Sequence, residues 1–394
     1  MNKIVSNLRN VLFALMSILM LTACSKDSTK KTPEQLFKEY SSGVVLIYSE
    51  YYYSITLPNG QTLYTQGLSD NGDVEYVTTD EELIKQNCSR KFGTGFFIDS
   101  KGDIMTNRHV VDVSIDEVEV QERIAASLRA ERQTYADSMN MAMQVMDDLK
   151  EKREKCYYLD YWGNICTNQE KLYEINNTIA YVAEKYEEWN YLYKYFSANS
   201  NPRDIKIDVY QKLGIAYNDT YVDDYDDFLG SNACVVRKVS KKKNADLAII
   251  RLKSRQTPDS VYVFDVSGMV MKEKKSKSFG DYFNQIVLGK TPMEKVKVDE
   301  LKMNQKLHMI GYNHGIILAQ TREGIQAQFT HGEVIQQPDG ETLRHDVSSM
   351  QGSSGSPIID DDGNLRGVNF GKISLEDNFN FAVPMNLVKN FLKE

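Results

Sequence analysis

Short runs of β-branched and aromatic residues, each closed by turn-forming residues, occur on both sides of a long central segment that lacks them. Runs of this kind predict β-strands. After residue 301 the alternation of runs and turns continues as far as residues 386–392, where the spacing of apolar positions predicts a short amphipathic helix. The runs before residue 301 are 43–49, 94–98, 104–106, 205–209, 233–236 and 247–250.

The central segment has a helical pattern instead. From about 115 to 155 the chain lacks proline and glycine, and apolar or small residues recur every three or four positions with one break, at Arg132. From 169 to 197 every step is three or four residues. Two such heptad helices joined by a short loop predict an antiparallel coiled-coil hairpin. The seam positions are Ala125, Leu128, Tyr135, Met139, Ala142, Met146, Leu149, Leu172, Ile175, Ile179, Val182, Tyr186, Trp189, Tyr193 and Phe196.

Helices of about 30–40 residues extend roughly 45–60 Å. A hairpin of that length over residues 115–197 suits an arm that binds a substrate or partner, or an element of self-association. It equally suits a passive insertion packed along the body of the protein. The sequence leaves these interpretations open.

Composition places the chain among globular proteins. Of its 394 residues, 41% are hydrophobic and 26% are charged, which excludes a mostly disordered, collagen-like or polytopic membrane protein. The net charge of −8 gives no indication of nucleic-acid binding, for which a basic surface is usual. Five cysteines are too few for a disulfide scaffold. Cys156 with Cys166 is the better candidate disulfide, and Cys88 with Cys234 is a weaker one.

The N-terminal segment has the features of an export signal. Basic Lys3 and Arg9 precede an apolar stretch, 11–21, that is shorter than the roughly 20 residues needed to span a bilayer. The sequence 21–24, Leu-Thr-Ala-Cys, resembles the lipobox of bacterial lipoproteins, in which the cysteine is acylated and becomes the new N-terminus. We therefore expect a protein of the bacterial cell envelope that is anchored by lipid on Cys24. The outer membrane is the favoured location, on either its periplasmic or its surface face.

Three local motifs carry candidate chemistry. His109 directly follows the run 104–106, Asp246 directly precedes the run 247–250, and Ser354 lies in the Gly-Ser-rich segment 351–357. The order His, Asp, Ser along the chain is that of chymotrypsin-like serine peptidases.

The residue types suit acyl transfer. A serine hydroxyl such as that of Ser354 becomes a good nucleophile when an imidazole, here His109, takes its proton. Asp246 would hold the histidine tautomer and stabilise the imidazolium. The backbone amides of Gly352 and Ser354 would supply the two donors of an oxyanion hole.

These motifs resemble those of serine peptidases of the HtrA (Deg) type. Residues 93–98 (GTGFFI), 106–111 (TNRHVV), 245–248 (ADLA), 352–357 (GSSGSP) and 381–384 (FAVP) match family motifs in order, whereas the central helical segment has no counterpart. Ser353 and Ser356 depart from the family pattern, the second where the family has glycine. The chain ends about ten residues after 381–384, so no PDZ domain is expected.

The resemblance implies a mainly β fold of two antiparallel six-stranded β-barrels, with the helical hairpin inserted in the first. It also implies a triad between the barrels. Because the sequence has no metal-ligand spacing and no phosphate-binding loop, no cofactor or metal is expected. The acidic run 360–364 is interpreted as a turn between strands. The implied segments are a signal peptide (1–23), a tether (24–42), a first barrel (43–112 and 203–254), a hairpin insertion (113–202), a linker (255–300) and a second barrel with the C-terminal helix (301–394).

The resemblance also suggests how substrate is bound. Ser348 would lie near the base of the pocket for the residue before the scissile bond, and the absence of an acid there favours a small or apolar side chain. Asn369, Phe370 and Gly371 would pair with the substrate backbone. The expected function is a serine endopeptidase acting on exported or misfolded proteins. The alternative is a latent or inactive protease fold that holds a partner through its helical hairpin.

Overall fold

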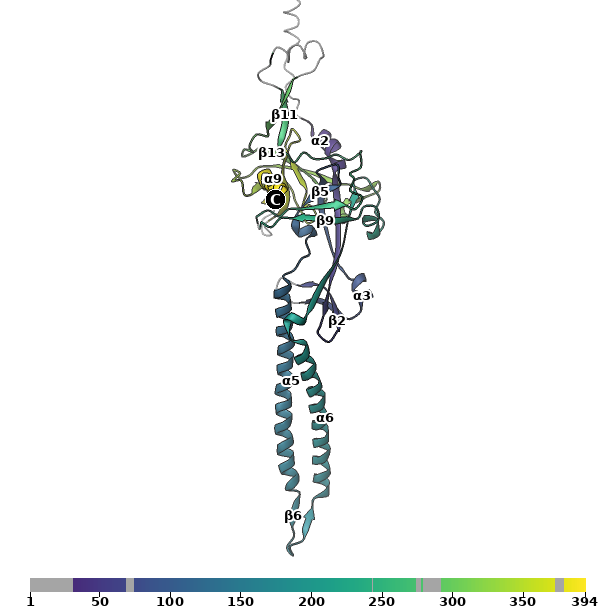
Figure 1. Cartoon of the computed structure of the whole chain (residues 1–394), viewed down its shortest axis with the longest axis vertical. Helices are drawn as coiled ribbons and strands as arrows, with labels where there is room; N and C mark the ends of the chain where they lie inside the picture. Colours follow the sequence, from purple (N-terminus) through teal and green to yellow (C-terminus); the bar gives the residue numbers. More distant parts are fainter. Residues whose placement is uncertain (1–30, 69–73, 243, 274–277, 279–291, 373–378) are drawn as a thin grey trace, which may run out of the picture. The chain divides into compact units, whose positions relative to one another are not determined.

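The computed structural model describes residues 31–68, 74–242, 244–273, 278, 292–372 and 379–394. The expected signal peptide (1–23) and acylated Cys24 lie outside these residues. The described fold is mainly β, with antiparallel sheets and one long helical hairpin (Figure 1). The chain divides into two compact units. The first unit consists of residues 1–48, 92–111 and 213–394, and the second of residues 49–91 and 112–212.

The strand runs on either side of the helical segment form one antiparallel sheet of eight strands. Its path is β3-β2-β1-β4-β5-β10-β9, and β8 pairs with β1. A bridge between Gly214 of β8 and Ala233, next to β9, connects those two strands as well. The strands are β1 (Val44–Thr56), β2 (Thr62–Leu68), β3 (Val74–Thr78), β4 (Ser89–Phe97), β5 (Asp103–Thr106), β8 (Lys206–Tyr217), β9 (Cys234–Val239) and β10 (Ala248–Leu252).

The C-terminal part of the chain forms a second sheet, of six strands, in the order β16-β13-β18-β19-β20-β17. The ends of its first and last strands meet. The Ile335 amide donates to the Arg344 carbonyl, and the Asp346 amide donates to the Glu333 carbonyl, both at 3.2 Å. The strands are β13 (Lys306–Gly311), β16 (Gln328–Glu333), β17 (Leu343–His345), β18 (Pro357–Ile359), β19 (Leu365–Lys372) and β20 (Asn380–Pro384).

Strand β1 of the first sheet and strand β13 of the second are each buried on two faces. Along β1, Val45 and Ile47 belong to a core cluster formed mostly by the first sheet, whereas Leu46 belongs to a core shared by both sheets. Along β13, Met309 belongs to a core of the second sheet and Ile310 to the shared core. Because successive strand residues point to opposite faces, a strand buried on both faces favours a continuous apolar run. β1 has such a run, and in β13 the run is interrupted only by buried His308.

Shorter elements complete the first unit. β11 and β12 form a two-stranded ribbon within the segment expected to be a linker, and β14 pairs with β15. The C-terminal helix predicted over 386–392 is confirmed as α9. These elements are β11 (Met269–Glu273), β12 (Met293–Lys297), α8 (Ile316–Ala319), β14 (Gln320–Thr321), β15 (Gly324–Ile325), α9 (Met385–Lys393) and the 3-10 turns η1 (Ser41–Gly43) and η3 (Tyr225–Phe228).

The expectation of a tether over 24–42 is wrong from residue 33 onward, because α2 (Pro33–Tyr40) is a helix. Thr32 caps it: the threonine hydroxyl accepts from the Gln35 amide at 3.3 Å, and the Gln35 side chain accepts from the Thr32 amide at 2.8 Å. Leu36 and Tyr40 are buried in the shared core. The segment 24–42 is polar in composition, and its sequence was therefore not recognised as containing a helix with an apolar face.

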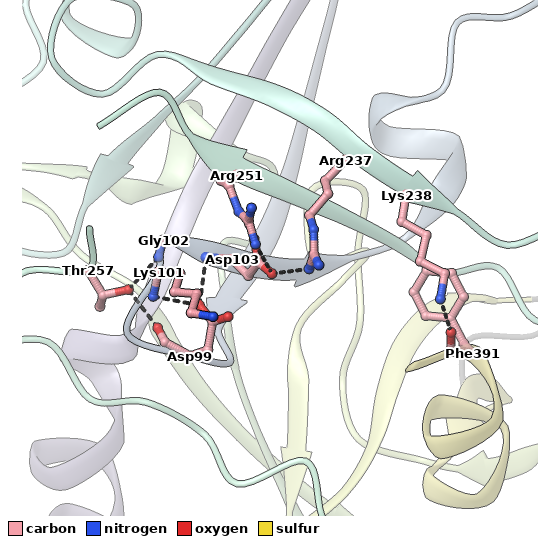
Figure 2. Close-up of polar contacts among 9 residues, drawn as sticks. All are labelled: Asp99, Lys101, Gly102, Asp103, Arg237, Lys238, Arg251, Thr257 and Phe391. Carbon is pink, nitrogen blue, oxygen red and sulfur yellow. Dashed lines mark hydrogen bonds and ion pairs between the residues drawn. The ribbon is translucent and has the colours of Figure 1, made fainter. Parts of the chain in front are cut away.

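Figure 2 shows the contacts that fix the start of β5. The Asp103 carboxylate is buried and accepts from Arg237 of β9 and from Arg251 of β10, whose Nη2 lies 2.8 Å from Oδ2. The Thr257 hydroxyl accepts from the Gly102 amide at 3.0 Å and donates to the Asp99 carbonyl at 2.6 Å. Because β5 leads directly to His109, these contacts also fix the approach to that residue.

The predicted helical hairpin is confirmed in the second unit, where α5 (Glu117–Glu154) and α6 (Gln169–Asn199) run side by side (Figure 1). Tyr135 of α5 and Phe196 of α6, both predicted seam residues, stack with ring centroids 5.6 Å apart. Among the described residues, no helix combines the length and apolarity needed to cross a membrane. The unit also contains α3 (Glu81–Gln86), β6 (Tyr157–Leu159), β7 (Ile165–Thr167) and η2 (Pro202–Asp204).

The expected disulfides are wrong, because Cys156, Cys166, Cys88 and Cys234 are all free thiols. In the ribbon of β6 and β7, Cys166 lies opposite Tyr158 rather than opposite Cys156. The Cys156 thiol instead turns toward the Lys152 carbonyl, at 3.5 Å. Cys156 and Cys166 are therefore close in the sequence but do not face each other across the ribbon.

Candidate active site

His109 and Asp246 are held together at the ends of neighbouring strands. β5 ends at Thr106, and the short helix α4 (Arg108–Val111) begins two residues later, while Asp246 precedes β10, which pairs with β5. His109 Nδ1 lies 2.5 Å from Asp246 Oδ2, and the His109 amide donates to Asp246 Oδ1 at 3.1 Å. The side chain of Asn107 donates to the Asp246 carbonyl at 2.7 Å. Both the backbone and the carboxylate of Asp246 are thus fixed by the segment that carries the histidine.

Asp246 remains ionised in this position. Burial alone would raise the pKa of its carboxyl group, but the hydrogen bond and charge of His109, together with the His109 amide, outweigh burial and lower the pKa. An ionised carboxylate only accepts hydrogen bonds, so His109 Nδ1 must carry the proton. With its proton on Nδ1, the neutral imidazole has Nε2 as its basic nitrogen, and the imidazole side chain is 50% exposed.

The loop that contains Ser354 is fastened to the same strands. The Ser354 carbonyl accepts from the Thr94 amide of β4 at 2.8 Å. Gly355 has φ +90°, and a Cβ on it would lie 2.0 Å from the Thr94 carbonyl oxygen and 2.4 Å from Thr106 Oγ1. Only glycine fits so close an approach at positive φ. Ser354, which is half-buried, is therefore anchored beside the end of β5, three residues before His109.

The two peptide units expected to bind an oxyanion have fixed orientations. The Gln351 carbonyl accepts from the His314 amide at 2.5 Å, and the Ser353 carbonyl accepts from the Asn369 side chain at 3.1 Å. In a trans peptide the N–H points opposite to the C=O, so these bonds direct the amides of Gly352 and Ser354 away from their partners. Within the described chain, neither amide donates to another protein group.

Thr94 joins the loop to the second sheet, a role that the sequence did not indicate. Its buried hydroxyl donates to the Gly352 carbonyl at 2.8 Å and accepts from the Tyr312 amide at 3.0 Å. The residues around Thr94 were recognised as a strand run and as a family motif, but neither pattern indicated a bond to Tyr312, which directly follows β13. The two residues Thr94 and Gly352 are 258 positions apart, so no local sequence pattern could predict their contact.

Replacing Thr94 with valine is expected to lower the free energy of unfolding by about 2 kcal/mol, because two buried backbone groups lose their partner. Urea denaturation would measure it. Thr330→Val is the matched control: the Thr330 hydroxyl also bonds a carbonyl, that of Ser348 at 3.2 Å, but in an exposed position. Equal losses in the two variants would contradict the bridging role of Thr94.

The residues expected to bind substrate lie in different environments. Ser348 is exposed, and Phe370 and Gly371 are half-buried in β19. Asn369 is fully buried, and its amide and carbonyl already pair with Ser356 and Gly355, at 2.9 and 2.7 Å. Its side chain supports the serine loop rather than a substrate, which leaves Phe370 and Gly371 as the candidates for backbone pairing.

Ser353 and Ser356, the two residues that depart from the family pattern, both fit into the structure through contacts with nearby residues. The buried Ser353 hydroxyl donates to the Met350 carbonyl at 2.6 Å and lies 2.8 Å from the Ser349 hydroxyl. Ser356 packs against Gly311, where a Cβ would come within 1.9 Å of the serine oxygen. The missing side chain at Gly311 therefore makes room for the additional hydroxymethyl group.

The acidic run 360–364 forms the turn expected between β18 and β19. The Asp360 carboxylate accepts from the amides of Asp362 and Asn364, both at 3.0 Å. In the part of the chain that the structure describes, no group of three or more His, Cys, Asp or Glu side chains could hold a metal ion.

Of the comparisons with known proteins, the one with solved structures gives a match. No protein-family model and no curated protein matches the sequence. Among solved structures, the chain is similar to the serine endoprotease from Yersinia pestis, with 11% sequence identity and a TM-score of 0.38. The match covers 92% of this chain and 66% of the Yersinia protein, just under two thirds of its length.

Proposed function

We propose that this chain is a serine endopeptidase of the HtrA type, with His109, Asp246 and Ser354 as its catalytic triad. The observation that carries the proposal is the hydrogen bond between His109 Nδ1 and the Asp246 carboxylate, 2.5 Å long, next to a serine loop anchored on β4 and β5. Neither a buried structural histidine nor a passive Gly-Ser loop requires that combination. The three proposed triad residues come from three separate motifs, and all of them belong to the first unit.

The proposed reaction follows from these positions. Ser354 Oγ attacks the carbonyl carbon of the scissile peptide bond while His109 Nε2 accepts the hydroxyl proton. The amides of Gly352 and Ser354 stabilise the negative oxygen of the tetrahedral intermediate. The imidazolium, stabilised by Asp246, then gives its proton to the leaving amine as the C–N bond breaks. Water attacks the resulting acyl-enzyme by the same route and releases the carboxylic acid product.

Two closed barrels would supply the frame for this site. Support for a first barrel comes from the ring β1-β4-β5-β10-β9-β8, in which the Gly214–Ala233 bridge joins the last two strands. Support for a second comes from the bridge between Val334 and His345, which joins the end of β16 to β17. Each ring contains six strands, as the family resemblance implies.

The substrates of the proposed enzyme are exported or misfolded polypeptides. Exposed Ser348 brings no charge to the pocket, which suits a small or apolar residue before the scissile bond. Phe370 and Gly371 would pair with the substrate backbone. The lipobox supports attachment to the bacterial cell envelope, most simply the outer membrane, through acylated Cys24.

A fluorophosphonate probe tests the proposal, because it reacts only with a serine that has an assembled base and oxyanion hole. The wild-type protein should be labelled and should hydrolyse casein, whereas Ser354→Ala should do neither. Ser356→Ala, two residues away and also in the loop, is the matched control and should keep both activities. Labelling of Ser354→Ala, or no labelling of a folded wild-type protein, would reject the peptidase and favour a binding module.

A further inference from the structure

The far end of the helical hairpin is unusually apolar for an exposed structure. We call residues 156–167, which contain β6 and β7, the hairpin tip. Tyr161 and Trp162 in its turn are 94% and 81% exposed, and the cross-strand pair Leu159 and Ile165 is 68% and 76% exposed. An isolated two-stranded ribbon is at best marginally stable in water. The tip therefore presents apolar side chains that a second surface is needed to cover.

The turn holds these side chains in a fixed arrangement. The Asp160 carboxylate accepts from the amides of Trp162 and Asn164, at 2.9 and 2.8 Å, and from the Asn164 side chain at 3.0 Å. Gly163 supplies the positive φ, +82°, that the turn requires. The rings of Tyr161 and Trp162 meet edge to face with centroids 5.6 Å apart. The aromatic pair is thus preorganised and points out of the turn.

The charges around the tip are balanced locally. Asp160 is the one ionised side chain in the sequence 156–167, and its oxygens are taken by the turn. At the end of α5, each lysine pairs with an acid one turn earlier: Lys150 with Asp147, Lys152 with Asp148 and Lys155 with Glu151. Arg153 and Glu154 complete a set of four basic and four acidic side chains over residues 147–155. The charge beside the tip therefore sums to zero, which matches a zwitterionic surface better than an anionic lipid or nucleic acid.

The distribution of apolar groups favours a fluid partner. Leu159 and Ile165 lie on one face of the ribbon, Tyr158 lies on the other, and Tyr161 and Trp162 occupy the turn. A folded protein would need a deep pocket to cover both faces and the end. Lipid headgroups and acyl chains can rearrange around such a wedge. Tryptophan and tyrosine are also the residues enriched where bilayers meet water.

We propose that the hairpin tip inserts into the interfacial layer of a zwitterionic phospholipid bilayer. The outer edges of β6 and β7 carry backbone groups that hydrocarbon would leave without hydrogen bonds, so insertion stops at the headgroup region. The contact is separate from the proposed peptidase activity. It also needs no lipid on Cys24, so an unacylated chain is suitable for testing it.

The chain has two tryptophans, Trp162 and Trp189, which permits a direct measurement. In the chain from residue 24 onward, carrying Cys24→Ser, the substitution Trp189→Phe leaves Trp162 as the single reporter. Addition of phosphatidylcholine vesicles should shift its fluorescence to shorter wavelength and protect it from acrylamide. An unchanged spectrum at saturating vesicle concentration would overturn the proposal. This readout leaves the tip sequence unaltered, so it does not depend on the folding of a tip variant.

Vesicle cosedimentation provides the second measurement. Tyr161→Ser, Trp162→Ser and Ile165→Ser together should weaken binding about tenfold or more. The matched control, Tyr173→Ser, Tyr181→Ser and Tyr191→Ser, removes exposed tyrosines along α6 and should bind normally. Equal effects of the two triple variants, or binding only to phosphatidylglycerol vesicles at low salt, would reject the tip as the lipid site. A tip-dependent dimer in sedimentation, without vesicle binding, would identify a second copy as the partner.

Discussion

Replacing Asp246 with asparagine is expected to lower kcat for peptide hydrolysis by about 10⁴-fold while the protein stays folded. The asparagine side chain can donate a hydrogen bond, whereas the carboxylate only accepts. In the variant, His109 can therefore present Nδ1 as an acceptor, which places its proton on Nε2. A protonated Nε2 cannot take the proton of Ser354, and the charge that stabilised the imidazolium is also lost. The rate would be measured on a fluorogenic peptide, with circular dichroism to verify folding.

Asp259→Asn is the matched control, because it makes the same change in charge at an exposed position of the first unit. Its kcat should equal that of the wild type. A loss smaller than tenfold in folded Asp246→Asn would remove Asp246 from the triad, even if Ser354 were labelled by a fluorophosphonate.

The sequence predicted those elements whose signals are local and repeated. The three-and-four spacing over 115–155 and 169–197 specified the helical hairpin because each helix has a stripe of mostly half-buried apolar positions that faces the other helix. The apolar runs of β1, β4 and β10 were recognisable because these strands are buried on two faces. The positions of His109, Asp246 and Ser354 could be proposed because each belongs to a short continuous motif.

Features that depend on distant partners were not predictable in this way. The helix α2 was taken for a tether, since the core that covers Leu36 and Tyr40 comes mostly from residues far along the chain. The disulfide between Cys156 and Cys166 was expected from sequence distance, but strand register decided against it. Asn369 was assigned to substrate, whereas its side chain bonds the Ser349 and Ser353 hydroxyls across a fold that the motif does not encode.

Acidification is expected to destabilise the protein through His345, which is fully buried in β17. Burial lowers the pKa of its imidazole from 6.5 to about 4, despite the opposing charge of Asp346. Above pH 6.5 the residue is neutral in both the folded and the unfolded chain, so it has no effect. Between pH 6.5 and about 4 only the unfolded chain binds the proton, and stability falls by about 1.4 kcal/mol per pH unit. Near pH 4 the loss from this one residue reaches about 3 kcal/mol.

Urea denaturation at several pH values between 7 and 4.5 would measure this loss, and His345→Leu isolates it from the carboxylates that titrate in the same range. The variant has no imidazole to protonate, so its free energy of unfolding should decline about 2 kcal/mol less than that of the wild type over this interval. His331→Gln removes an exposed histidine from the neighbouring strand β16 and should keep the wild-type pH dependence. Parallel curves for the wild type and His345→Leu would mean that His345 reaches water, and therefore that the end of β17 opens at low pH.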